Sequence, residues 1–217
     1  DMSVEDAQKL AENLGLQHSV IPIGDIYDSF NKGLEKEFKG KEKDITEENL
    51  QSRCRGVILM ALSNKSGDLV LTTGNKSETA VGYSTLYGDT AGGFGVLKDV
   101  PKTMVYELSR YRNTISKVIP ERIIDRPPTA ELAPDQKDTD SLPDYDILDK
   151  IIELYVEQDK SKEEIESLGV GNDVIERVLR LIDISEYKRR QAPLGVKITS
   201  RGFGKDRRYP ITNKFIK

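Results

Sequence analysis

Apolar residues recur at helical spacing along the first third of the chain. They fall three or four positions apart, which places them on one face of an amphipathic helix. The expected helices are residues 3–15, 25–38 and 46–67, the last of them with Thr46 as its N-cap. Between the first two, residues 18–23 have the apolar content of a short strand. This part of the chain is therefore expected to be one strand among three helices.

A different pattern begins at Asp68. Residues 69–71 are an unbroken apolar run, two threonines follow, and the chain then turns at Gly74. A short unbroken run is typical of a strand buried in a parallel sheet, so residues 68–73 are expected to form one. Residues 74–78 would then stand at the carboxyl end of that strand, where open α/β sheets bind ligands.

Glycines and aromatic residues alternate in residues 82–98. This segment is too rich in glycine for regular structure and too aromatic for a flexible linker. We expect an ordered loop that brings backbone close to a ligand. A helix with Asp99 as its N-cap is expected next and extends to Arg112. Lys102 lies in its first turn, where the helix N-terminus already favours anions.

The rest of the chain predicts an acidic connection followed by helices. Residues 126–142 carry prolines and acidic side chains and are expected to be extended, mobile and solvated. Helices are expected after Ser141 and Ser161, which can cap them, and from Asn172 onward. From residue 189 the glycines and prolines predict an irregular tail. Together these elements indicate an α/β fold, a Rossmann-like parallel sheet with flanking helices, followed by a helical part in residues 143–217 of the same domain.

Composition narrows the setting in which this chain works. Its 217 residues are 36% hydrophobic and 32% charged, and no stretch approaches the ~20 apolar residues that span a bilayer. The single cysteine, Cys54, cannot form an internal disulfide and falls on the apolar face of a predicted helix, which fits a reducing compartment. We therefore expect a cytoplasmic protein with no membrane contact.

The net charge of −4 hides an asymmetry. From Lys188 to Lys217 there are ten Lys or Arg residues and one acid, Asp206. Such a tail is expected to dock against phosphate groups, nucleic acid or an acidic surface. A nucleic-acid-binding module is the less favoured interpretation, because the interleaved aromatic residues are few and no DNA- or RNA-binding motif is present.

Four polar residues form the candidate chemical site: Thr73, Glu78, Lys102 and Thr129. Hydroxyls and backbone N–H groups can hold a nucleotide, a lysine neutralises phosphate, and a carboxylate holds a divalent cation. Taken alone, each has a commoner explanation as turn chemistry, helix-terminal charge or a solvated lysine. The single histidine, His18, argues against a zinc site or a histidine-based triad, and no Walker-type G-x-x-x-x-G-K-[ST] sequence is present.

Several stretches resemble the synthetase domain of the glutamine-dependent NAD synthetases, members of the ATP-pyrophosphatase class. The matching stretches are Glu48–Gly56, Leu71–Glu78, Val81–Asp89, Lys98–Thr103, Arg126–Leu132, Lys188–Pro193 and Phe203–Asn213. The resemblance implies that residues 1–142 are a partial nucleotide-binding α/β synthetase domain. It also implies a two-step reaction: ATP adenylates the nicotinate carboxylate of deamido-NAD with loss of pyrophosphate, and ammonia then displaces AMP to give NAD.

The resemblance further implies roles for single residues. Thr73, Lys102 and Thr129 match positions that bind ATP, and Glu78 matches a position that holds magnesium beside deamido-NAD. The positions around deamido-NAD, some of which reach across a dimer interface in the family, are matched by Asn49, Arg53, Asp89, Lys188 and Arg189. The expected cofactors are therefore ATP and Mg²⁺, and the expected assembly is a homo-oligomer built on a dimer.

Two parts of the family pattern are absent from this sequence: the S-G-G-x-D-S phosphate loop and the N-terminal glutaminase domain. Leu86 stands where the ammonia-dependent short forms carry a lysine, which points to the glutamine-dependent branch. We therefore expect ammonia to come from a glutaminase domain outside this chain, and the chain alone to make no NAD. Another ligase of the same class, one that aminates a purine nucleotide, is the alternative, although it would not need the loop at residues 83–89.

Overall fold

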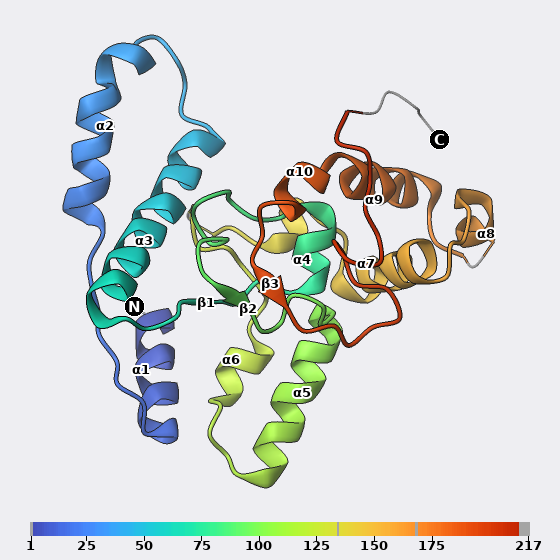
Figure 1. The fold of residues 1–217 in the computed structure, drawn as a ribbon, viewed down its shortest axis with the longest axis horizontal. Coiled ribbons are helices and arrows are strands. Elements are labelled where there is room, and N and C mark those ends of the chain that lie inside the picture. Colours follow the sequence, from blue (N-terminus) through green and yellow to red (C-terminus); the bar gives the residue numbers. More distant parts are fainter. Residues whose placement is uncertain (1, 134, 168, 213–217) are drawn as a thin grey trace.

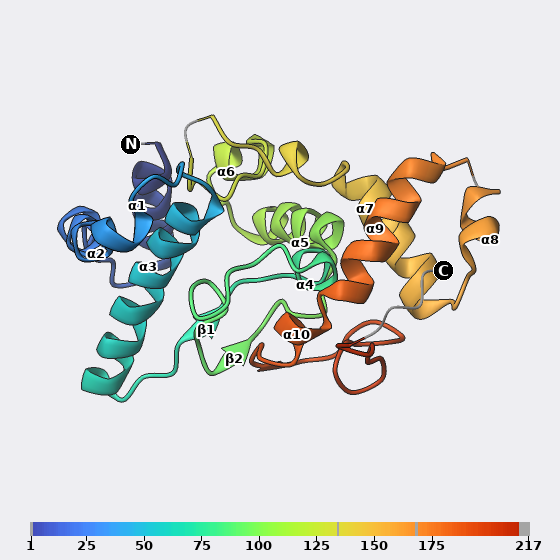
Figure 2. The ribbon, with the colours of Figure 1, turned by 90° about the horizontal axis from the view of Figure 1, so that it is seen from above.

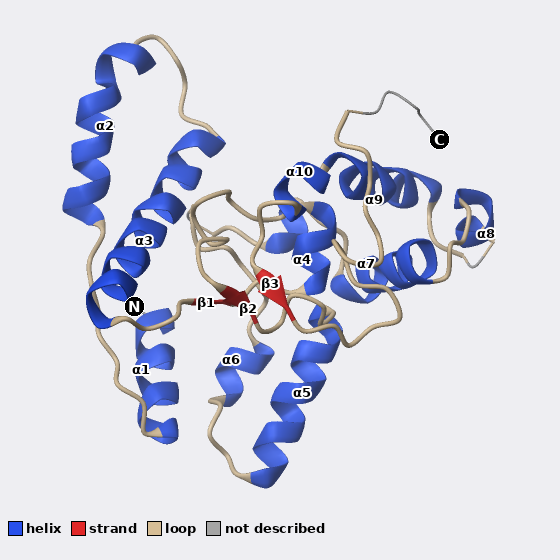
Figure 3. Ribbon diagram, viewed as in Figure 1, coloured by secondary structure: helices blue, strands red, loops and turns tan. Residues whose placement is uncertain are grey.

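The computed structural model describes residues 2–133, 135–167 and 169–212. Its helices are α1 (Met2–Leu14), α2 (Gly24–Phe38), α3 (Ile45–Ser66), α4 (Lys76–Val81), α5 (Lys102–Ile115), α6 (Glu121–Asp125), α7 (Tyr145–Ile152), α8 (Lys162–Glu166), α9 (Asn172–Ile184) and α10 (Glu186–Arg189). Its strands are β1 (Leu71–Thr72), β2 (Phe94–Gly95) and β3 (Leu194–Gly195). A 3₁₀ turn, η1 (Asp138–Asp140), precedes α7, and a π-helical turn, η2 (Glu153–Glu157), extends it. The strands lie at the centre and the helices surround them (Figure 1, Figure 3).

The three strands form a parallel sheet in the order β1–β2–β3. Leu71 pairs with Phe94, and Thr72 pairs with Gly95. The connections between successive strands contain helices, α4 in the first and α5 to α10 in the second, as parallel pairing requires a crossover. The prediction of an α/β fold with a parallel sheet and flanking helices is confirmed.

Two strand predictions need correction. Residues 18–23 form no strand, because no described strand lies alongside them to pair with. Val20 in this segment is 59% exposed. The strand predicted at 68–73 is limited to Leu71–Thr72. Thr72 is buried, whereas Leu69 is 64% exposed. An apolar run predicts burial only where other elements cover it, and the described residues cover this run in part.

The main hydrophobic core lies among the C-terminal helices rather than under the sheet. The four residues of α9 that the sequence places on one face, Ile175, Val178, Leu179 and Ile182, are all buried there. They pack with the inner face of α7, and Ala80 and Val81 of α4 join the same cluster. The helix that follows β1 is therefore anchored on the helical part of the molecule.

Helix starts agree with the predicted cap at one position and differ at three, in α3, α5 and α7. The capping box at Ser161 is confirmed. Helix α3 is capped by Asp44 rather than Thr46, because the Asp44 carboxylate accepts the N–H of Thr46 at 2.7 Å. A charged acceptor at a helix N-terminus gains from the helix dipole as well as from the hydrogen bond. Helix α7 follows Asp144 rather than Ser141.

Helices α2 and α3 lie side by side along one flank, with α1 beside them (Figure 1, Figure 2). This flank leaves apolar side chains at the surface, among them Phe30, which is 46% exposed. None of the helices described combines the length and the apolar content that crossing a bilayer requires.

Candidate functional site

The turn between β1 and α4 is closed by a capping box. The Asn75 side chain accepts the N–H of Glu78 at 3.0 Å, and the Glu78 carboxylate accepts the N–H of Asn75 at 3.2 Å. The asparagine and the glutamate three positions later are a helix-start pattern that the sequence displays. The box draws the Glu78 side chain back toward the turn, beside Thr73 at the end of β1.

Lys102 meets Glu78 at the start of α5. The Lys102 ammonium lies 3.3 Å from the Glu78 carboxylate, and both side chains are about one-fifth exposed. The ammonium also lies 5.4 Å from the ring centroid of Tyr145, within cation–π range. Two residues of the candidate site that are distant in sequence are thus adjacent in space.

The start of α5 is held by residues that the sequence patterns do not single out. Ser77 Oγ accepts the N–H of Lys102 at 2.8 Å. The Asp149 carboxylate, from α7, accepts the N–H of Thr103 at 2.9 Å and bonds the hydroxyl of Ser77. The prediction that Asp99 caps this helix is wrong, since the N-cap residue is Pro101. The Ser77 hydroxyl and the distant Asp149 carboxylate thus accept the N–H groups of Lys102 and Thr103, which a local cap would otherwise bond.

A cavity of about 910 Å³ opens beside this turn. Seven of the nine predicted site residues line it: Thr73, Glu78, Asp89, Lys102, Thr129, Lys188 and Arg189. The groups predicted to share one cavity are therefore brought together, although they come from the β1 turn, the glycine-rich loop, α5, the 126–142 segment and α10.

Asn49 and Arg53 are not among the residues that line the cavity. The Asn49 side-chain oxygen accepts the Thr85 hydroxyl at 2.7 Å. Arg53 Nε donates to the Leu86 carbonyl at 3.2 Å. In this structure both residues, which belong to α3, hold the glycine-rich loop (residues 82–98) through these hydrogen bonds. Their predicted contact with deamido-NAD stays a prediction.

The glycine-rich loop is ordered, as predicted, and packs closely on α3. Both Asp89 carboxylate oxygens lie 3.0 Å from the Thr85 N–H, and the Asp89 N–H donates to Ser52 Oγ at 3.0 Å. A Cβ on Gly88 would lie 2.2 Å from Ser52 Oγ, so only glycine allows this approach. The glycines therefore serve close packing of the cavity wall.

Arg189 is buried, and each of the three nitrogens of its guanidinium donates a hydrogen bond within the protein. It donates to the Glu186 carboxylate at 3.0 Å and to the carbonyls of Ala80 and Ile182, both at 2.6 Å. The ring of Phe203 lies 4.7 Å from its guanidinium carbon. These contacts join α10 to α4 and to the tail, so the geometry favours a structural task for Arg189.

Lys188 differs from its neighbour in having no carboxylate within 4 Å among the described residues. Its ammonium donates to the carbonyls of Gly82 at 2.7 Å and Ser84 at 2.6 Å. Loss of hydration lowers the pKa of Lys188 below its ordinary value. An ammonium in that position can meet an anion bound in the cavity.

Asp138 is a site residue that sequence reasoning missed. The acidic run at 126–142 was expected to be solvated, but Asp138 is 4% exposed and lines the cavity. Its Oδ2 accepts the Tyr145 hydroxyl at 2.7 Å, while Oδ1 has no partner among the described residues. Burial and the neighbouring Asp138 raise the pKa of both Tyr145 and Tyr83. Nothing in the run of acids distinguishes Asp138, because its burial depends on α7 packing beside it.

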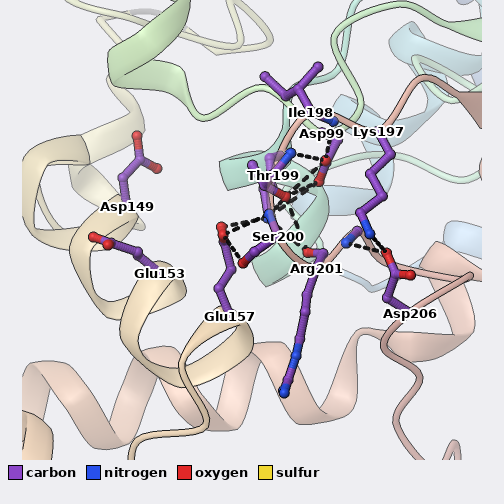
Figure 4. A network of polar contacts seen from close by, with 12 residues as sticks. Asp99, Asp149, Glu153, Glu157, Lys197, Ile198, Thr199, Ser200, Arg201 and Asp206 are labelled. Carbon is purple, nitrogen blue, oxygen red and sulfur yellow. Dashed lines mark hydrogen bonds and ion pairs between the residues drawn. The ribbon is translucent and has the colours of Figure 1, made fainter.

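The tail from residue 197 docks against acidic side chains, as its charge predicted. Figure 4 shows the segment from Lys197 to Arg201 between Asp99 and Glu157. Asp99 accepts the N–H groups of Ile198 and Thr199, both at 2.8 Å. Burial alone would raise the pKa of Asp99, but these hydrogen bonds bring it below the ordinary value.

Lys76 completes this contact from beneath. Its ammonium, 1% exposed, lies 2.7 Å from Glu157 and 3.3 Å from Asp99, and it donates to the Arg201 carbonyl at 3.0 Å. Farther along, Arg207 lies 3.2 Å from Asp159. Lys197, Arg201 and Arg207 are thus paired with Asp206 and Asp159, whereas Lys205 and Arg208 have no ion pair among the described residues.

The chain matches the family model of NAD synthase over residues 1–192. The glutamine-dependent NAD(+) synthetase of Acinetobacter baylyi is 57% identical over 214 residues, which are 98% of this chain and 40% of that protein. Among solved structures, the glutamine-dependent NAD+ synthetase of Acinetobacter baumannii in complex with ADP is 50% identical, with a TM-score of 0.58 over 97% of this chain and 38% of that one.

A glutamine-dependent NAD(+) synthetase from Cytophaga hutchinsonii, 24% identical with a TM-score of 0.78, shares the fold over 96% of this chain and 36% of that one. The chain thus spans about 40% of the length of the relatives it matches. The family match covers every predicted site residue and the cavity that seven of them line. The chain belongs to the NAD synthase family.

Proposed function

We propose that the full-length protein makes NAD from deamido-NAD. ATP adenylates the nicotinate carboxylate, pyrophosphate leaves, and ammonia released from glutamine displaces AMP. The names of the relatives support this assignment, as does the ADP complex of the Acinetobacter baumannii enzyme. A cytoplasmic homo-oligomer built on a dimer, with the glutaminase activity outside this chain, belongs to the same proposal.

The observation that carries the proposal is the shared cavity. Thr73, Thr129, Lys102 and Glu78 line one space of about 910 Å³. A volume of that order suits a nucleotide-sized ligand. Adenylation needs no protein nucleophile, since the substrate carboxylate attacks the α-phosphorus itself. The protein must instead hold the two substrates and neutralise the charge that develops on the phosphates.

Each residue then has a task in the first step. Lys102, in the first turn of α5, neutralises phosphate charge. Thr73 and Thr129 offer hydroxyl groups to the nucleotide. Lys188 faces the dinucleotide from α10. The loop at 83–89, held by Asn49 and Arg53, forms the wall against which the second substrate rests.

Magnesium fits this site if phosphates supply most of its ligands. Among the described residues no group of three His, Cys, Asp or Glu side chains is placed to hold a metal. Mg²⁺ is commonly held by one or two carboxylates together with substrate phosphates and water, so the single carboxylate of Glu78 is sufficient. When bound there, the ion would neutralise phosphate charge beside Lys102.

Asp138 has a task in the second step. Ammonia attacks the acyl carbon, AMP leaves with its bonding electrons, and the new amide nitrogen must lose a proton. The Asp138 Oδ1 atom, which has no hydrogen-bond partner among the described residues, is a buried acceptor on the cavity wall; it can accept an N–H hydrogen bond from the attacking ammonia and then take the proton that the nitrogen loses. The adjacent Tyr145 hydroxyl holds this carboxylate in place.

The experiment is an assay of the full-length protein with ATP, Mg²⁺, deamido-NAD and either glutamine or ammonium. We expect NAD, AMP and pyrophosphate in equal amounts. Lys102→Met should lower the rate about 100-fold, the usual loss when one charge-stabilising group is removed. The matched control is Lys43→Met, which removes an exposed lysine remote from the cavity and should leave the rate unchanged.

Two results would contradict the proposal. One is the absence of NAD when wild-type protein is supplied with all substrates. The other is preferential amination of xanthosine monophosphate over deamido-NAD, which would identify the chain as part of a purine-directed ligase instead.

A further inference from the structure

The cations that line the cavity fall into two groups. Three of them have a carboxylate within 4 Å: Lys102 with Glu78, Arg126 with Glu131, and Arg189 with Glu186. Arg55 has no such partner but is exposed to water. Lys98 and Lys188 are half-buried and, among the described residues, have no carboxylate within that distance. Of these two ammonium groups, Lys188 still interacts with the Asp89 carboxylate from beyond 4 Å, whereas no carboxylate of the described residues acts on Lys98.

Lys98 follows β2 at the carboxyl end of the parallel sheet and is not among the nine predicted site residues. Its ammonium donates to the Pro193 carbonyl and to no other described residue. Loss of hydration lowers its pKa, with no neighbouring acid to offset the effect. Burying an ammonium group that exchanges its hydration for one hydrogen bond to a carbonyl is energetically unfavourable. Such groups are found in proteins where a bound ligand supplies the missing interactions.

The hydrogen bonds of the two lysines leave donors free. An ammonium has three N–H groups. Lys98 uses one, on Pro193, and Lys188 uses two, on Gly82 and Ser84. Both side chains line the cavity along the segment from Lys188 to Pro193. The free donors of Lys98, and its charge without a carboxylate partner among the described residues, suit an anion with several oxygens.

We propose that Lys98 binds a phosphate group of a nucleotide ligand, in a subsite that is separate from the Glu78–Lys102 pair. The assignment rests on the proposed function, because it takes the ligands to be ATP and deamido-NAD. Two sources can supply the phosphate: the dinucleotide and the triphosphate. Lys98 touches the ligand in this proposal and is a binding residue, not a group that transfers protons.

A purely structural task for Lys98 is the competing explanation, since its hydrogen bond to Pro193 could serve only to hold β3 beside β2. The two explanations differ in what removal of the charge should do. If Lys98 is a structural anchor, its removal should weaken the binding of every ligand and lower the stability of the fold. A phosphate-binding ammonium supports only phosphorylated ligands, and its half-buried charge costs stability when no ligand is bound.

The test measures equilibrium binding to the full-length protein by calorimetry with three probes: deamido-NAD, ATP and adenosine. Lys98→Met removes the charge and keeps most of the length of the side chain, and Lys98→Arg retains the charge. We expect Lys98→Met to weaken binding of at least one phosphorylated probe by about 10- to 100-fold, the usual effect of a charged hydrogen bond. Adenosine should bind unchanged, Lys98→Arg should bind nearly as wild type does, and the melting temperature of Lys98→Met should not fall.

The pattern of losses distinguishes the outcomes. A loss confined to deamido-NAD or to ATP supports the subsite and identifies which ligand places its phosphate there. An equal loss for adenosine, or a lower melting temperature with unchanged nucleotide binding, overturns it in favour of a structural anchor. If wild type binds none of the three probes, the proposed function fails, whereas normal wild-type binding with an unaffected Lys98→Met variant contradicts only this inference.

Discussion

The buried ammonium of Lys76 should control how firmly the tail is attached. Lys76 is 1% exposed and sits between Asp99 and Glu157, whose side chains are 7% and 14% exposed. Lys76→Met would leave two nearly buried carboxylates facing each other without a cation. Breaking a buried ion pair by removal of one partner costs about 3–5 kcal/mol, because the remaining charge is uncompensated.

The structure places the expected value near the lower end of that range. Asp99 would keep the N–H groups of Ile198 and Thr199, and Glu157 would keep the hydroxyl of Ser200 at 2.7 Å. We therefore expect a loss of about 3 kcal/mol, concentrated in residues 197–208. Amide hydrogen exchange reports such local opening, and this loss corresponds to roughly 100-fold faster exchange in that segment.

The measurement is hydrogen exchange followed by mass spectrometry on the full-length protein. Peptides from α9 should keep wild-type protection, since its buried face packs in the main core, to which α7 and α4 contribute as well as the tail. Lys9→Met is the matched control, because Lys9 is 62% exposed in its pair with Glu12 and such pairs contribute about 0–1 kcal/mol. An acceleration of the tail below about tenfold would refute the assignment of Lys76 as its anchor.

Three further changes test separate parts of the structure. Asp99 has a lowered pKa in the folded protein, so its contribution to stability is complete above its ordinary value of 3.8 and is lost as the pH falls through the lower folded value. The stability difference between wild type and Asp99→Asn should therefore be constant near neutral pH and shrink below pH 3.8. Gly82→Ala should cost about 2 kcal/mol or more in thermal unfolding, because Gly82 has φ +68° and an added Cβ would lie 2.3 Å from Ser185 Oγ. Asp138→Asn should lower the rate of the ammonium-dependent assay about 100-fold while ATP affinity stays unchanged.

Each of these has a contrary outcome. A difference between wild type and Asp99→Asn that persists unchanged at pH 3 would mean that the Asp99 carboxylate does not hold the tail. Gly33→Ala is the control for Gly82, since an added Cβ there meets nothing, and equal effects at both positions would remove the steric argument. Unaltered turnover in Asp138→Asn would show that its free oxygen takes no part in the second step.

Structural features that depend only on residues close together in the chain can be predicted from the sequence. The capping asparagine and glutamate that close the β1 turn, the inner face of α9, and the box at Ser161 are local patterns with local causes. The same holds for the first-turn position of Lys102. The matching stretches indicated the family as well, and the comparison confirms it over residues 1–192.

Contacts between distant segments were not accessible in this way. Thr46 and Asp44 are both good capping residues, and only the folded backbone selects Asp44. Asp99 is a residue type that often caps helices, yet it accepts the N–H groups of residues about 100 positions later. The Asp149 carboxylate instead accepts an N–H group at the start of α5. Periodicity does not report which carboxylate will reach a given N–H group.

The sequence by itself determined the α/β class, the helix faces and the residue types that gather around phosphate, because these follow from local spacing and from the family pattern. Only the tertiary structure decided that Asp138 is buried with one oxygen unbonded among the described residues, and that the Arg189 guanidinium is hydrogen-bonded inside the protein. It also decided that Lys98 and Lys188 have no carboxylate within 4 Å among the described residues. The physical reason is that burial and charge compensation depend on which segments pack together, and that packing joins residues far apart in the chain.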